Sequence, residues 1–172
     1  MSKANKWIIG AMLVLLVGAS GGLYFWRSHA RQSQEIGQCQ ASLRNLSIAI
    51  LTYSTDNKGW MPPTLQALPS AGESMVCPAG LQRGLSENSQ PAGSYIYTAG
   101  NLKITQLKLA SETVVAYEPL SYHGGSGMHV LYLDGHTRWL KGDKAESMMK
   151  ELGAGHNPPN VQGEEKKEED ED

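Results

Sequence analysis

The feature that most constrains this chain is an uncharged apolar run, from Trp7 to Trp26, near its amino terminus. A helix of about 20 residues rises about 30 Å, which matches the hydrocarbon core of a bilayer. A tryptophan stands at each end of the run, with Tyr24 beside the second, as aromatic residues do at membrane interfaces. The run therefore predicts a membrane-spanning helix.

The helical pattern continues beyond Arg27, where apolar residues recur at spacings of three and four. That spacing places them on one face of a helix. We expect one long helix that ends near Asp56–Gly59, where the glycine suits a C-cap. Its second half should pack on a soluble domain through the face formed by Ile36, Cys39, Leu43, Leu46, Ile50 and Tyr53.

A cleaved signal peptide is the alternative to a permanent anchor. Lys3 and Lys6 precede the run, and small residues at 18–21 suit a signal peptidase. The apolar residues continue past them to Trp26, however, which exceeds the usual length of a secretory signal. We expect an uncleaved, single-pass anchor in the inner (cytoplasmic) membrane, with the soluble domain outside the cytoplasm.

Charge is unevenly placed along the chain, although the formal net charge is only −2. No acidic residue occurs before Glu35, whereas residues 164–172 contain only acids and two lysines. A near-neutral protein with an acidic end gives no sign of nucleic-acid binding. We divide the chain into an anchor and juxtamembrane helix (1–34), a soluble domain (35–152) and a disordered acidic tail (153–172).

The soluble domain should combine the helix with a small antiparallel sheet, in the pilin-like α+β class. Asp134-Gly135 between two β-rich runs predicts a hairpin with a two-residue type I′ turn. That turn would set Val130 opposite Trp139, on one face of the hairpin. A glycine- and proline-rich loop is expected over Ser70–Gly93. The predicted strands are Ser94–Thr98, Thr113–Tyr117, Met128–Leu133 and His136–Leu140, followed by a short helix over Glu146–Leu152.

Cys39 and Cys77 are the only cysteines of the chain. A disulfide between the helix and the loop would add about 3–4 kcal/mol of stability by the chain-entropy estimate. Such a bond is permitted outside the cytoplasm. The alternative is two unrelated buried thiols. Their spacing does not match a zinc motif.

One group of polar residues could bind a metal ion or take part in catalysis: His123, His129, Asp134 and His136. Imidazole and carboxylate can bind divalent metals, but Asp134 is needed in the turn, so surface histidines are the simpler interpretation. No nucleophile motif and no phosphate loop is present. We therefore expect a non-enzymatic protein without a metal or cofactor.

Several short motifs resemble those of one family when they are taken in order. They are Cys39–Leu46 with its Asn-Leu ending, Tyr53, Asp56-Asn57 with Gly59 and Pro62, Cys77-Pro78, Ser94-Tyr95 with Tyr97, and His123 followed by Asp134-Gly135. Together they resemble pseudopilin-like, prepilin-type proteins related to type II secretion, of the kind numerous in planctomycetes and verrucomicrobia. The resemblance covers roughly residues 35–140.

The chain departs from the family pattern at two places. Ten residues, rather than the nine of the family signature, separate His123 from Asp134. The usual prepilin cleavage motif, with its glutamate at the head of the apolar run, is missing. The resemblance implies a membrane-anchored structural protein of secretion assembly, with pilin-like or secretion-system partners. The alternative is an anchored extracytoplasmic module that binds a ligand or metal through the Ser70–Gly93 loop or the histidine-bearing hairpin.

Overall fold

The computed structural model describes residues 3–68, 72–86, 91–107 and 109–160, without the side chains of residues 3–23, 25, 27–30, 73 and 74. Helix α1 spans Lys3–Asp56, and the chain divides into two compact units, Met1–Gly37 and Gln38–Asp172. Among the described residues, no helix has a stretch long and apolar enough to cross a membrane. Nearly all side chains of the predicted span, Trp7–Trp26, lie outside that description.

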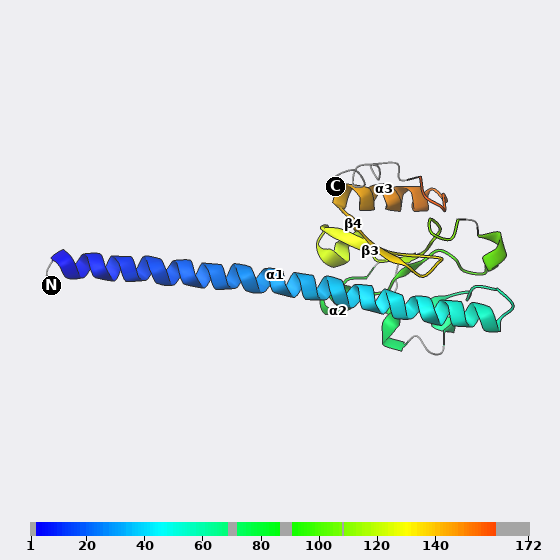
Figure 1. Ribbon diagram of the computed structural model, residues 1–172, viewed down its shortest axis with the longest axis horizontal. Helices are drawn as coiled ribbons and strands as arrows, with labels where there is room; N and C mark the ends of the chain where they lie inside the picture. Colours follow the sequence, from blue (N-terminus) through cyan, green and yellow to red (C-terminus); the bar gives the residue numbers. More distant parts are fainter. Residues whose placement is uncertain (1–2, 69–71, 87–90, 108, 161–172) are drawn as a thin grey trace, which may run out of the picture. The chain divides into compact units, whose positions relative to one another are not determined.

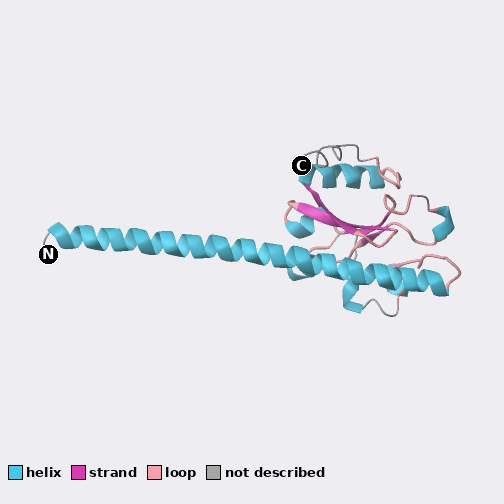
Figure 2. Ribbon diagram, in the orientation of Figure 1, coloured by secondary structure: helices cyan, strands magenta, loops and turns pink. Residues whose placement is uncertain are grey.

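The predicted α+β class with a small antiparallel sheet is confirmed. Four strands, each hydrogen-bonded to the next along the chain, form an antiparallel meander in the order β1-β2-β3-β4 (Figure 2). A short helix, α2, lies within the segment that the sequence predicted as a loop. The bounds are α2 Pro78–Gln82, β1 Ile96–Tyr97, β2 Val114–Tyr117, β3 Gly127–Tyr132, β4 Thr137–Lys141 and α3 Gly142–Gly153.

Helices cover both faces of the sheet in the second unit, so its core has two parts (Figure 1). On one face, the predicted apolar stripe of α1 packs against Val115, Ala116 and Leu131. On the other face, Ala145 and Met148 of α3 close a smaller cluster. Because both faces are covered, the central strands β2 and β3 are buried along nearly their whole length and do not alternate between buried and exposed residues. The buried residues of the α1 stripe include Cys39, Leu43, Leu46 and Ile50.

The β3–β4 hairpin is present, but the predicted register is wrong by one residue. His129, not Val130, pairs with Trp139. The loop holds three residues, because Gly135 N donates to Tyr132 O at 2.9 Å and Gly135 has a φ of +90°. This is a type I turn closed by a glycine bulge, the usual three-residue alternative to the two-residue turn. The shift moves Trp139 to the face that carries His129.

Gly127 makes close packing of the hairpin possible. A Cβ built at Gly127 would collide with Leu140 O and would lie 2.5 Å from Cζ2 of Trp139. We expect Gly127→Ala to lower the free energy of unfolding by about 1–3 kcal/mol, as overpacking does. Gly153→Ala is the matched control, because its Cβ meets nothing within 4 Å. Urea unfolding of the two variants checks this, and equal midpoints would contradict it.

Candidate functional site

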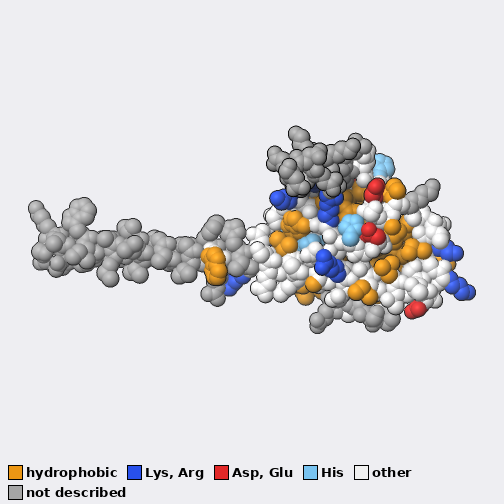
Figure 3. All heavy atoms as spheres, viewed as in Figure 1, with side chains coloured by type: hydrophobic (Ala, Val, Ile, Leu, Met, Phe, Trp, Pro, Cys, Tyr) orange, Lys and Arg blue, Asp and Glu red, His pale blue; other side chains and the backbone are white. Residues whose placement is uncertain are grey.

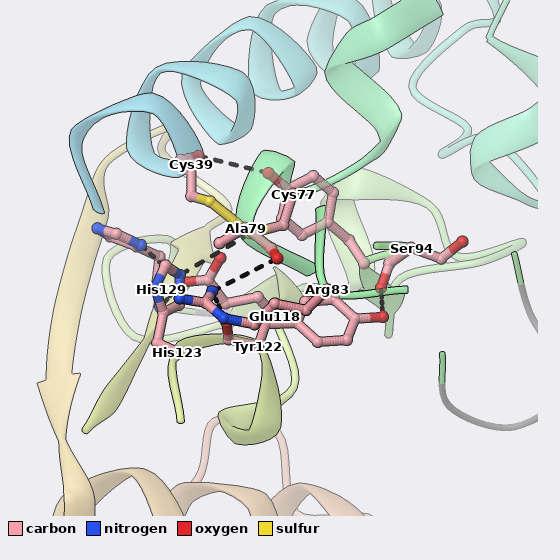
Figure 4. Close-up of a disulfide and its surroundings, with 10 residues drawn as sticks. Cys39, Cys77, Ala79, Arg83, Ser94, Glu118, Tyr122, His123 and His129 are labelled. Carbon is pink, nitrogen blue, oxygen red and sulfur yellow. Dashed lines mark hydrogen bonds and ion pairs between the residues drawn. A yellow bond between two sulfur atoms is a disulfide. The ribbon is translucent and has the colours of Figure 1, made fainter. Parts of the chain in front are cut away.

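The candidate site is a buried polar cluster beneath the disulfide between Cys39 and Cys77. The predicted bond is present and joins α1 to the residue that precedes α2, with 5.0 Å between the two Cα atoms. Below it lie Glu118, His123 and His129 (Figure 4). The exposed fractions of these side chains are 0 %, 1 % and 1 %. A carboxylate this deep in a protein requires partners, because burial penalises the charged form.

The backbone brings Glu118, His123 and His129 together from the end of β2, the turn that follows it, and β3. Glu118 directly follows β2, and its N–H donates to His129 O at 3.2 Å, which continues the pairing with β3. Pro119 then begins a 3-10 turn over Leu120–His123. Gly124 ends that turn with a φ of +64°, a conformation that glycine adopts at little cost. The turn returns the chain so that His123 faces the carboxylate.

Among the described residues, the hydrogen bonds and ion pairs of the Glu118 carboxylate fall on one of its two oxygens. Oε1 of Glu118 lies 2.6 Å from His129 Nδ1 and 3.0 Å from His123 Nε2, and it accepts the backbone N–H of His129 at 2.6 Å. An ionised carboxylate only accepts hydrogen bonds, so both ring nitrogens that face it carry protons. Oε2 is buried and has no hydrogen-bond partner among the described residues. The carboxylate is therefore half satisfied.

The cluster extends from the histidines to the sulfur and to an aromatic cover. Nε2 of His123 lies 3.8 Å from Cys77 Sγ. The Trp139 ring packs edge-on against His123 and His129, with centroid distances of 5.2 and 4.7 Å. Four potential metal ligands are gathered here, since atoms of Cys39, Cys77, Glu118 and His123 all lie within 4.8 Å of one another.

The surrounding polypeptide fixes this arrangement through hydrogen bonds, two of them buried and one partly buried. Tyr95 Oη donates to Cys39 O at 3.4 Å, and Tyr122 Oη donates to Ser94 O at 3.0 Å. Arg83 of the α2 C-cap donates to Tyr122 O at 2.6 Å. Burial, reinforced by the charge of Glu118, raises the pKa of Tyr95, so this phenol stays neutral.

Burial alone would raise the pKa of the Glu118 carboxyl, but hydrogen bonds from His123 and His129 outweigh it and hold this pKa below its ordinary value. A lowered folded-state pKa stabilises the fold above the unfolded value of 4.5, and the contribution disappears as the pH falls through the folded value. His123, His129 and Tyr95 are the titratable groups that interact with this carboxyl.

We therefore expect the stability difference between the wild type and Glu118→Gln to shrink as the pH falls below about 4.5, because only the wild type can gain this proton. Urea unfolding of both proteins at a series of pH values from about 6 to about 3 measures the difference. A difference that stays constant below pH 4.5 would show that the carboxylate is not stabilised in the fold.

The structure divides the four residues that the sequence offered as a metal cluster. His123 and His129 belong to the buried cluster, but His136 lies apart, with its Nδ1 2.6 Å from Asp134 Oδ1 at an exposed turn. The His136 ring also stacks on Tyr132, with centroids 4.3 Å apart. Asp134 and Gly135 thus lie in the three-residue loop of the hairpin, and they do not share a site with His123.

Sequence reasoning missed Glu118, the centre of the cluster. Its partners are 5 and 11 positions away, and only the pairing of β2 with β3 sets it opposite His129. The available signal was a glutamate directly after a strand that is apolar throughout and directly before a proline. A charged residue at such a position is expected to need a buried partner.

Comparisons with known proteins do not assign this chain to a family. No family model, no curated protein and no solved structure matches it.

Proposed function

We propose that this chain is a membrane-anchored, pseudopilin-like structural protein of secretion assembly, and that it is not an enzyme. The observation that carries the proposal is that one helix contains two different segments. Helix α1, Lys3–Asp56, contains the apolar run in its first half, and the apolar stripe of its second half is buried in the core of an α+β domain. This agrees with the resemblance of residues 35–140 to pseudopilin-like proteins.

The burial of the Glu118 cluster supports a structural rather than a catalytic role for this domain. A catalytic group must reach its substrate. The Glu118 and His129 side chains are 0 % and 1 % exposed, and Trp139 packs against both histidines. The signature residue His123 points inward to this cluster (Figure 4). Its interactions join the 3-10 turn to the end of β2.

The disulfide supports the proposed location, with the domain outside the cytoplasm and the anchor in the inner membrane. Disulfides persist in oxidising compartments and are rare in the cytosol.

Figure 3 shows Lys and Arg side chains dispersed over the face of the second unit in view, without one continuous basic patch there. The partners that fit this proposal are other pilin-like or secretion-system proteins, in contact along the helix.

Cross-linking in membranes tests the proposal. Leu13→Glu places a carboxylate in the proposed span, and a charge there disfavours both insertion and helix–helix contact. We expect this variant to lose cross-linked oligomers that the wild type forms. Leu109→Glu is the matched control, because Leu109 is 60 % exposed in a loop. The control should cross-link as the wild type does.

The alternative, an anchored binding module, predicts a different pattern. In that case the chain would still bind its partner after Leu13→Glu, as long as the variant reaches the membrane. Binding of the partner would be lost instead after a change in the exposed part of the β3–β4 hairpin, such as His136→Ala. That pair of results would replace the assembly proposal with the binding module.

A further inference from the structure

The residues around the disulfide also form the donor set of a transition-metal site. Two sulfur atoms, one imidazole nitrogen and one carboxylate oxygen lie within 4.8 Å of one another, from Cys39, Cys77, His123 and Glu118. All four residues are buried. Zinc in proteins is held tetrahedrally by cysteine, histidine and carboxylate ligands. Thiolate ligands favour zinc over magnesium or calcium.

The unpartnered oxygen of Glu118 is an independent indication of a ligand site. Oε2 is buried and accepts no hydrogen bond among the described residues, while three contacts converge on Oε1. A buried acceptor without a partner costs about 1–3 kcal/mol. A cation bound to Oε2 would remove this cost. His129 would then hold the carboxylate through Oε1, as outer-shell groups orient metal ligands.

We propose that reduction of the Cys39–Cys77 disulfide converts this cluster into a Zn²⁺ site formed by both thiolates, His123 Nε2 and a Glu118 oxygen. A dithiol reductant supplies two electrons and two protons, so that the sulfur–sulfur bond breaks, two thiols form and the dithiol becomes a disulfide. Zn²⁺ then displaces the two thiol protons. The ring proton of His123, which lies on Nε2 facing Glu118 in the disulfide form, moves to Nδ1, so that Nε2 can bind the ion.

The two states exclude each other but join the same parts of the fold. Each sulfur that binds its neighbour covalently is no longer a thiolate, which is the ligand that zinc requires. Zinc–sulfur bonds are about 2.3 Å long, so the two sulfurs need only separate until both reach one ion. The bound metal would therefore link α1 to the segment before α2, as the disulfide does, and add the end of β2 and the turn over Leu120–His123.

Titration with Co²⁺ alone, followed by Zn²⁺ alone, tests the proposal on the full-length chain. The protein is reduced with a phosphine, which takes the oxygen of a water molecule and leaves two protein thiols. We expect one equivalent of Co²⁺ to give thiolate charge-transfer absorption and the strong visible bands of tetrahedral cobalt. Zn²⁺ should displace it. The oxidised chain should bind neither ion.

Variants identify the ligands. Glu118→Gln and His123→Gln should each weaken Zn²⁺ binding about 100-fold. This is the upper end of the range seen when an outer-shell partner of a metal ligand is removed. His136→Gln is the control and should bind as the wild type does, because His136 is paired with Asp134 at the surface. The double variant Cys39→Ser, Cys77→Ser should show no charge-transfer band.

Reduction of the disulfide could itself loosen the fold. Near-ultraviolet circular dichroism of the reduced chain, recorded with and without Zn²⁺, measures whether tertiary packing is lost and regained. We expect Zn²⁺ to restore the spectrum of the oxidised protein. The proposal is overturned if the reduced chain binds no Co²⁺, or if Zn²⁺ leaves a loosened fold unrestored. It is also overturned if Glu118→Gln and His123→Gln bind as tightly as the wild type, since the thiols alone would then hold the ion.

Discussion

Glu118→Ala should lower the free energy of unfolding by about 3–5 kcal/mol, the range for removing one partner of a buried charged pair. The reason is the convergence of three donors on a single oxygen. Without Oε1, the backbone N–H of His129 and the facing ring nitrogens of His129 and His123 lose their acceptor. Each buried donor left without a partner costs about 1–3 kcal/mol.

Two further variants separate the loss of the acceptor from the loss of charge. Glu118→Gln keeps one acceptor oxygen and should therefore cost less than Glu118→Ala. Glu146→Ala removes an exposed carboxylate from α3 and should stay within about 0.5 kcal/mol of the wild type. Urea unfolding of the oxidised proteins at neutral pH measures all three. Equal losses for Glu118→Ala and Glu146→Ala would mean that the cluster contributes nothing to stability.

Loss of the disulfide should cost about 4 kcal/mol. The bond closes a loop with a sequence separation of 38, and the chain-entropy estimate for a loop of that length gives this value. The double variant Cys39→Ala, Cys77→Ala should therefore unfold at a much lower urea concentration than the oxidised wild type. For the reduced wild type, a chelator in the buffer keeps metal ions from binding the two thiols.

Reduction of the wild type provides the matched comparison. Treatment with a phosphine should lower its unfolding midpoint toward that of the double alanine variant, whereas the variant itself should not respond to the reductant. A wild type that keeps its midpoint after both thiols are shown to be free would contradict this assignment. In that case α1 would be held to the domain by its apolar stripe alone.

The parts of the fold that depend on local pattern could be predicted from the sequence. The spacing of Cys39, Leu43, Leu46 and Ile50 sets one helix face, and all four are buried. Asp134-Gly135 marked the hairpin, because only a few turns suit that pair. The predicted register of the hairpin was wrong by one residue, because the same pair fits more than one type of turn. The sequence does not decide between a two-residue turn and a three-residue turn with a glycine bulge, and the choice moves Trp139 to the opposite face.

The centre of the site could not be predicted, because it depends on contacts between distant segments. The sequence, with one cysteine on a helix face and another in a loop, allowed either a disulfide or two unrelated thiols, and the disulfide is present. The convergence of Glu118 on His129 requires the pairing of β2 with β3, and this pairing contains an irregularity between Val114 and Ala116. No local pattern records such a bulge. The buried carboxylate therefore emerges only from the folded arrangement.

The most direct test of the proposed function is the fate of the first 26 residues. Intact-mass analysis and membrane fractionation of the protein expressed in a Gram-negative host measure it. We expect a full-length chain that stays in the membrane fraction and resists extraction by salt. A membrane-bound chain shortened within its first seven residues would add prepilin-type processing to the proposed function. A soluble chain shortened near residues 19–22 would contradict it, because the apolar run would then be a signal peptide and the domain a free secreted module.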